Sequence, residues 1–108
     1  MRIRHTMAAA AGALLLVLTL PGSASAADGE FAYKYGSGSA GRMLDPETSN
    51  CTNIPEATEA SPAYAPQNAT NGIATFFAAA DCEGDAYVQM DPGATLGDDV
   101  KGLSVHFR

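Results

Sequence analysis

The N-terminal segment constrains this chain most, because it sets both the size and the chemical environment of the part that folds. Two arginines, Arg2 and Arg4, precede an uncharged apolar run over residues 7–20. The small-residue sequence Ala24-Ser25-Ala26 follows. This order is typical of a secretory signal peptide with its cleavage site. We therefore expect residues 1–26 to be a signal peptide and residues 27–108 to form a single secreted domain.

A retained membrane anchor is the alternative interpretation of this segment. The run over residues 7–20 is shorter than the roughly 20 apolar residues that a membrane-spanning helix needs. No cysteine follows the run to carry a lipid. We expect no stable membrane anchor and an extracellular location.

The expected domain is strongly acidic. It holds four basic residues against twelve acidic ones, which gives a net charge of −8. A phosphate backbone repels such a surface, so nucleic-acid binding is not expected. The lack of a basic patch argues against anionic membranes as well. Solubility outside the cell explains the acidity most simply, and cation binding is the more specific alternative.

A domain of this size builds only a small core, and small exported domains are often stabilised by disulfides. Cys51 and Cys82 are the only cysteines in the chain. Because the exported compartment is oxidising, we expect them to pair. A metal pair or a reactive thiol is the alternative. A zinc site is not expected, since His106 is the one histidine left to help.

Alternation of apolar and polar residues predicts strands throughout the domain. No segment carries a sustained helical stripe. The sequence therefore predicts an all-β fold of four to seven short strands, a small sandwich of Greek-key type. The expected strands are Phe31 to Tyr35, Arg42 to Leu44, Ile73 to Phe77, Ala86 to Met90 and Leu103 to Phe107.

Two segments are predicted to lack regular structure. Residues 36–41 are rich in glycine and serine and indicate a flexible turn or loop. Residues 49–71 hold three prolines and many small polar residues, which indicates a long irregular connection fixed at Cys51. Ile54 is its one large aliphatic residue and is expected to anchor it to the core. Connections of this length are often functional.

The residues that could support catalysis do not form a recognisable motif. Ser104 and His106 alternate with Val105 and Phe107, so both are expected on the outer face of the last strand. No G-x-S-x-G sequence is present to expose a nucleophile. We expect the protein not to be an enzyme. Two glycosylation patterns, at Asn50 and Asn68, are expected to stay unmodified.

Two groups of carboxylates could bind a hard cation, which takes six to eight oxygen ligands. Asp81, Glu83 and Asp85 alternate through one turn, and Asp98 and Asp99 precede the last strand. Neither group matches an EF-hand loop. Solvated acidic turns are the simpler interpretation of both.

The C-terminal half resembles the βγ-crystallin family. Phe77, four residues, Cys82, one residue and Gly84 follow the order of its aromatic and glycine motif, with Cys82 at the second aromatic position. The turn Pro92-Gly93 and the ending from Asp98 to Phe107 come in the order that the fold uses. The whole pattern looks like small secreted actinobacterial proteins, best from Asn68 onward.

This resemblance implies a Greek-key sandwich of βγ-crystallin-like type, with Cys82 in the packing position of a core aromatic. It also implies two roles: calcium binding, and inhibition of secreted peptidases as in a microbial branch of the fold. The calcium pattern would use Asp98 and Asp99. In this chain Ser104 comes one residue late for that pattern, so we expect calcium to bind weakly or not at all, and no other cofactor is expected.

The leading hypothesis is a monomeric, secreted, non-enzymatic binding protein, with secreted peptidases as the most concrete partners. The expected inhibitory segment is Ile54, Pro55 and Glu56, within residues 49–66, since the prolines and Cys51 would hold it in extended form and reduce the entropy lost on binding. The alternative class is a structural or stress-related extracellular protein with weak calcium affinity, and a secreted enzyme comes third.

Overall fold

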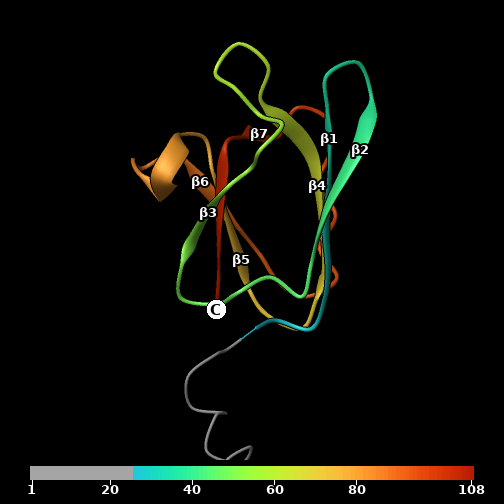
Figure 1. Cartoon of the computed structure of the whole chain (residues 1–108), viewed down its shortest axis with the longest axis vertical. Helices are drawn as coiled ribbons and strands as arrows, with labels where there is room; N and C mark the ends of the chain where they lie inside the picture. The colour runs from blue at the N-terminus through green and yellow to red at the C-terminus, as the bar shows by residue number, and fades with distance from the viewer. Residues whose placement is uncertain (1–25) are drawn as a thin grey trace, which may run out of the picture.

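The computed structural model describes residues 26–108, and the alternating segments form two antiparallel sheets that pack face to face (Figure 1). The signal peptide expected over residues 1–26 lies, apart from Ala26, outside the described residues. No helix within residues 26–108 has the length and apolarity that crossing a membrane requires.

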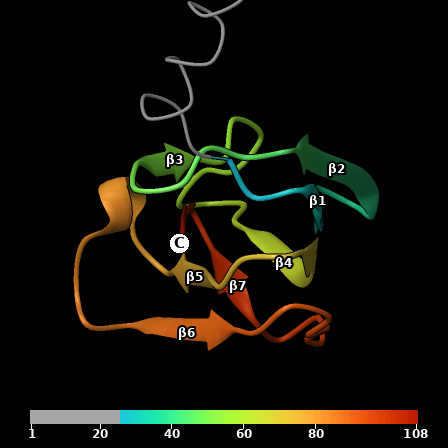
Figure 2. The same ribbon diagram turned by 90° about the horizontal axis from the view of Figure 1, so that it is seen from below.

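Each sheet has four strands. The first sheet has the order β2 (Ser39–Leu44), β1 (Gly29–Tyr35), β4 (Ala63–Thr70) and β7 (Lys101–Gly102). The second has the order β3 (Cys51–Asn53), β8 (Ser104–Phe107), β5 (Ala74–Phe77) and β6 (Tyr87–Met90). A short 3-10 turn, η3 (Ala80–Cys82), lies between β5 and β6. Figure 2 separates β1, β2 and β4 from β3, β5 and β6.

The core lies between the sheets and is built from the inward residue of each alternating pair. Phe31 and Tyr33 of β1 face Phe76 of β5 and Phe107 of β8. The rings of Phe31 and Phe107 meet edge to face, with centroids 5.4 Å apart, which is a favourable aromatic geometry. Aromatic burial from both sheets therefore holds the two layers together.

The prediction of an all-β sandwich with one disulfide is confirmed. Residues 26–108 form eight strands rather than four to seven, because β3, β4 and β7 were not expected. The crystallin type of the sandwich stays an expectation from the resemblance.

The irregular connection predicted over residues 49–71 is wrong at β3 and in its second half, where β4 is the longest strand among residues 26–108. Proline argues against a strand because it cannot donate to the ladder. Here Ala65 adopts φ 52°, and the pairing with β1 shifts register between Ala32 and Lys34. The resulting bulge accommodates Pro66, whose carbonyl accepts a hydrogen bond from the Leu96 amide at 3.0 Å.

The loop predicted over residues 36–41 is also shorter than expected. Only residues 36–38 form the turn, and residues 39–41 belong to β2. Gly41 is required within that strand, since a Cβ there would come within 2.4 Å of the Tyr33 ring. The missing side chain lets the Tyr33 ring lie across β2.

Candidate binding surface

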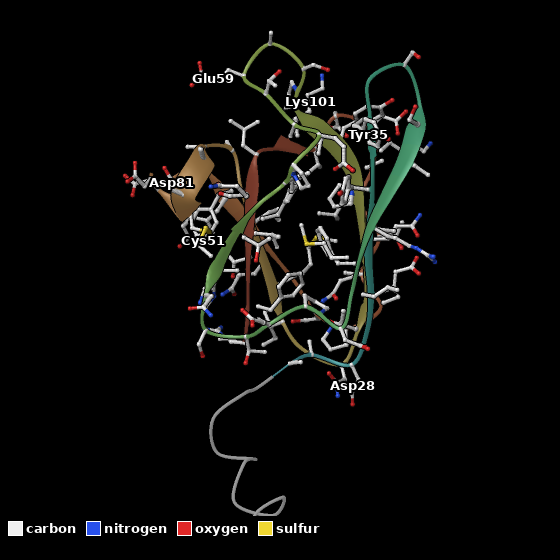
Figure 3. The ribbon with its side chains drawn as sticks, viewed as in Figure 1. Asp28, Tyr35, Cys51, Glu59, Asp81 and Lys101 are labelled. Carbon is white, nitrogen blue, oxygen red and sulfur yellow. A yellow bond between two sulfur atoms is a disulfide. The ribbon has the colours of Figure 1, made fainter. Side chains whose placement is uncertain are left out.

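Two connections lie at the same end of the second sheet. We call them the β3–β4 loop (residues 54–62) and the β5–β6 connection (residues 78–86). Figure 3 shows Glu59 on the first and Asp81 on the second, both pointing outward. Neither segment has a core of its own, so its conformation depends on specific links to the sheets.

The disulfide links the β5–β6 connection to β3. Cys51 and Cys82 are bonded, with their Cα atoms 5.9 Å apart. Cys51 pairs with His106 across β3 and β8, on the face opposite to the buried Val105. The bond therefore lies on the outer face of the second sheet. The expectation that Cys82 packs like a core aromatic is wrong, because Cys82 is only half-buried and lies outside the core cluster.

A reciprocal pair of hydrogen bonds holds the same connection one residue earlier. The Asn53 side-chain amide donates to Asp81 Oδ1 at 2.9 Å, and the Asp81 backbone amide donates to Asn53 Oδ1 at 2.8 Å. Asp81 and Cys82 both adopt left-handed backbone, with φ 61° and 54°. That conformation costs roughly 1–2 kcal/mol per residue, so the pair and the disulfide together offset it.

Ser104 supplies a third link from below the connection. Its hydroxyl donates to the Ala79 carbonyl at 2.6 Å and accepts from the Cys82 amide at 2.9 Å. Ser104 lies on the outer face of β8, as its alternation with Val105 predicts, yet it is fully buried. The β5–β6 connection covers it.

The β3–β4 loop is attached differently. Ile54 is 2% exposed and packs in the core, while Pro55 and Glu56 are exposed. The structure thus divides the expected inhibitory segment into an anchor and two accessible residues. The Ala57 amide donates to the Ile54 carbonyl, and the Thr58 and Ser61 amides donate to each other's carbonyls, so the loop is folded into turns rather than extended.

Tyr33 braces the loop from the core. Its hydroxyl donates to Glu56 Oε1 at 2.6 Å. Burial raises the pKa of Tyr33 above its ordinary 10.0, and the hydrogen bond and negative charge of Glu56 raise this pKa further. A protonated phenol therefore holds the carboxylate at the base of the loop.

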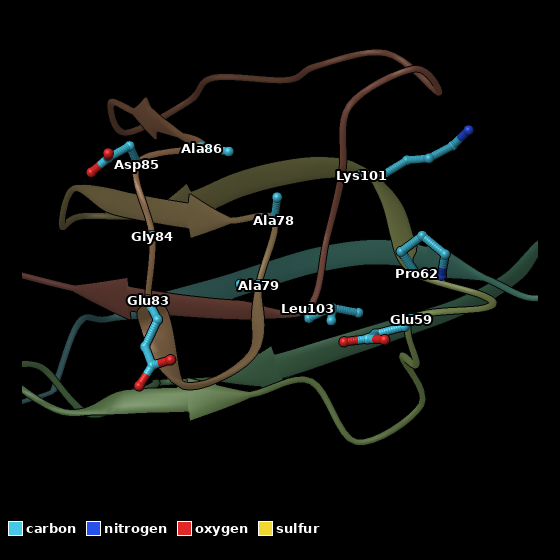
Figure 4. A pocket seen from close by; sticks show the side chains of 10 residues that line it. All are labelled: Glu59, Pro62, Ala78, Ala79, Glu83, Gly84, Asp85, Ala86, Lys101 and Leu103. Carbon is cyan, nitrogen blue, oxygen red and sulfur yellow. The ribbon is translucent and has the colours of Figure 1, made fainter.

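A groove with a volume of about 460 Å³ lies between the two connections (Figure 4). Small apolar side chains and carboxylates both line it. Glu59 and Pro62 come from the β3–β4 loop, and six of the other lining residues, three of them alanines and two of them acids, come from the β5–β6 connection. The groove is lined by Glu59, Pro62, Ala78, Ala79, Glu83, Gly84, Asp85, Ala86, Lys101 and Leu103.

Ser104 and His106, the two residues considered for catalysis, both belong to β8. The Ser104 hydroxyl is buried and engaged with Ala79 and Cys82, as described above. A nucleophile needs its hydroxyl exposed and hydrogen-bonded to a base. The two hydrogen bonds of Ser104 instead attach the β5–β6 connection to β8.

The expected calcium ligands are solvent-exposed. Asp98 and Asp99 form the turn before Val100, whose amide donates to the Gly97 carbonyl at 3.1 Å. Within residues 26–108, no three His, Cys, Asp or Glu side chains come close enough together to hold a metal ion. The same is true of Asp81, Glu83 and Asp85, which do not form such a group.

Asn68, noted in the sequence only for its glycosylation pattern, is a structural centre of the fold. It is 1% exposed. Its amide donates to the carbonyls of Gly72 and Met90, each at 2.9 Å, and its Oδ1 accepts from the amide and hydroxyl of Thr70. The sequence feature that could have indicated this structural role is an Asn two residues before a Thr at the end of a strand.

No family model, curated protein or solved structure matches this chain.

Proposed function

We propose that this protein is a secreted binding protein without catalytic activity, and that it acts as an inhibitor of extracellular peptidases. The observation that carries the proposal is the β3–β4 loop, whose exposed residues follow two contacts that fix the start of the loop. Ile54 is buried at its start, and Tyr33 fixes Glu56 two residues later.

Preorganisation is what makes such a loop suited to tight binding. A free loop loses conformational entropy when it binds, and this loss subtracts from the affinity. The turn bonds of Ala57, Thr58 and Ser61 already restrict the loop before any partner arrives. A peptidase binds its substrate segment in one fixed conformation. A loop that is already fixed can bind in the substrate site of the peptidase and resist the movement of its backbone that cleavage requires.

The acidic charge supports the choice of partner class. A net charge of −8 on the domain steers it toward partners with a basic surface and away from nucleic acids. The disulfide supports the proposed location, since such bonds persist mainly in oxidising compartments.

Residues 27–108, refolded with the disulfide formed, would be assayed against a panel of secreted serine, cysteine and metallopeptidases. We expect one-to-one inhibition of at least one member. Pro55→Gly combined with Glu56→Ala should weaken it by at least about tenfold, because the loop regains freedom and Tyr33 loses its acceptor. Pro92→Gly, in the exposed turn at residues 92–93, is the matched control. No inhibition across the panel, or equal loss in the control, would contradict the proposal.

A further inference from the structure

The groove between the two connections has a floor that suits an aliphatic chain. Ala78, Ala79 and Leu103 line it, and Pro62 closes one side. The floor is fixed in place: the Ala78 amide donates to the Ala86 carbonyl at 2.9 Å, and the Leu103 amide donates to the Phe77 carbonyl at 2.9 Å. An occupant would therefore meet a preformed apolar surface.

The rim of the groove is negative from both sides. Glu59 comes from the β3–β4 loop, and Glu83 and Asp85 come from the β5–β6 connection. Within residues 26–108, the one ion pair joins Arg42 to Glu30 at 3.3 Å. None of the three rim carboxylates is thus neutralised by an ion pair, not even with Lys101, which also lines the groove.

An apolar floor with an anionic rim matches a side chain that is aliphatic along its length and cationic at its end. Lysine and arginine are built this way and bury their stems while their charged groups stay at the surface. The net charge of −8 adds a long-range attraction for a positive partner.

We propose that this groove receives one lysine or arginine side chain of the partner protein. The stem lies over Ala79 and Leu103, and the cation lies between Glu59 and Glu83. This inference rests on the proposed function in one respect only, namely that the partner is a protein. It assigns the groove as a second contact beside the β3–β4 loop.

The test uses blocked tripeptides on the disulfide-bonded domain of residues 27–108, followed by NMR of the Ala78, Ala79, Ala86 and Leu103 methyl groups. Acetyl-Gly-Arg-Gly-amide should shift these signals in a saturable way. The same peptide with norleucine in place of arginine keeps the stem without the charge, and should bind at least about fivefold more weakly. Putrescine should also bind more weakly than the arginine peptide.

A pair of matched variants separates the groove from the overall charge. Glu59→Gln/Glu83→Gln and Asp98→Asn/Asp99→Asn each remove two exposed carboxylates. We expect at least about fivefold weaker arginine-peptide binding in the first and less than about twofold in the second at physiological salt. Equal effects, equal binding of norleucine or of putrescine, or no saturable shift would each overturn the proposal.

These results are independent of peptidase inhibition. Peptide binding in the groove without inhibition of any panel member would support the groove as a binding site and refute the proposed function. Inhibition that is unchanged by Glu59→Gln/Glu83→Gln, together with no peptide binding, would do the reverse.

Discussion

The two connections that flank the groove are held in place by different means. The β5–β6 connection is attached to the second sheet by a disulfide, by the Asn53–Asp81 pair and by the buried Ser104 hydroxyl. The β3–β4 loop depends on one buried side chain, Ile54, and on the Tyr33–Glu56 hydrogen bond. One side of the groove is thus covalently fixed, and the other side is held by weaker contacts.

The two sides of the groove differ in how strongly they must be held. The β5–β6 connection adopts left-handed backbone at two successive residues, and strong links are needed to maintain it. The β3–β4 loop contains ordinary turns, so a single brace is enough. The β5–β6 connection should therefore be the more rigid of the two, and the β3–β4 loop should be held less strongly.

The largest effect should come from removing the disulfide. The bond closes a loop with a sequence separation of 31, so Cys51→Ala/Cys82→Ala should lower the free energy of unfolding by about 3–4 kcal/mol. The melting temperature should fall by more than about ten degrees. Calorimetry of the oxidised protein and the variant measures this. An unchanged melting temperature would show that the other links suffice to hold the β5–β6 connection.

Ser104→Ala should have a smaller effect on the same connection. It leaves the Ala79 carbonyl and the Cys82 amide without their partner, which should cost about 1–2 kcal/mol in urea denaturation. Ser37→Ala, in the exposed turn between β1 and β2, is the control and should change stability by less than about 0.5 kcal/mol. Equal effects of the two variants would show that the Ser104 hydroxyl does not stabilise the β5–β6 connection.

Tyr33→Phe tests the brace of the β3–β4 loop. Loss of the hydrogen bond to Glu56 should cost about 1 kcal/mol, since the ring stays in the core. Tyr64→Phe removes a longer, exposed hydrogen bond to the Gly36 carbonyl at 3.3 Å and should cost less. If Tyr64→Phe were the more damaging in urea denaturation, the brace would not be the stronger contact.

The same residue gives the protein a pH dependence. The pKa of Tyr33 is raised in the folded state from an ordinary 10.0, so the unfolded chain releases this proton first. The stabilisation is fully present below pH 10 and is lost as the pH rises above it. We expect the urea midpoint to fall more steeply between pH 10 and 11.5 than it does in Tyr33→Phe. Parallel curves for the two proteins would contradict this assignment.

The smallest expected effect is that of calcium. Asp98 and Asp99 form an exposed turn, and among residues 26–108 no third His, Cys, Asp or Glu side chain joins them in a metal-binding group. About 1 mM calcium chloride should raise the melting temperature by less than about 3 °C, which corresponds to a dissociation constant no tighter than millimolar. A low-micromolar constant from calorimetry would overturn the expectation.

The sequence predicts the sheets well where side chains alternate. β1, β5, β6 and β8 follow from period-two patterns of aromatic and aliphatic residues. It does not predict β4, because Pro66 and Asn68 argue against a strand. The bulge at Ala65 and the internal hydrogen bonds of Asn68 make both residues acceptable, and each depends on partners distant in the sequence.

The candidate site is only partly visible in the sequence. The disulfide follows from the cysteine count and the expected compartment, and it is confirmed. Alternation puts Ser104 on the outer face of β8, yet its burial depends on the β5–β6 connection folding back over the sheet. The groove joins Glu59 to Glu83 across separate connections, and no local pattern brings them together.

Amide hydrogen exchange tests most directly whether both sides of the groove are preformed. In the free, disulfide-bonded domain, the Asp81 and Cys82 amides should be the most protected of the two connections, because Asn53 Oδ1 and Ser104 Oγ accept from them. The Ala57 and Ser61 amides of the β3–β4 loop should exchange faster, yet still at least about tenfold more slowly than in an unfolded chain. Exchange of all four amides at the unfolded-chain rate would contradict a preformed binding surface.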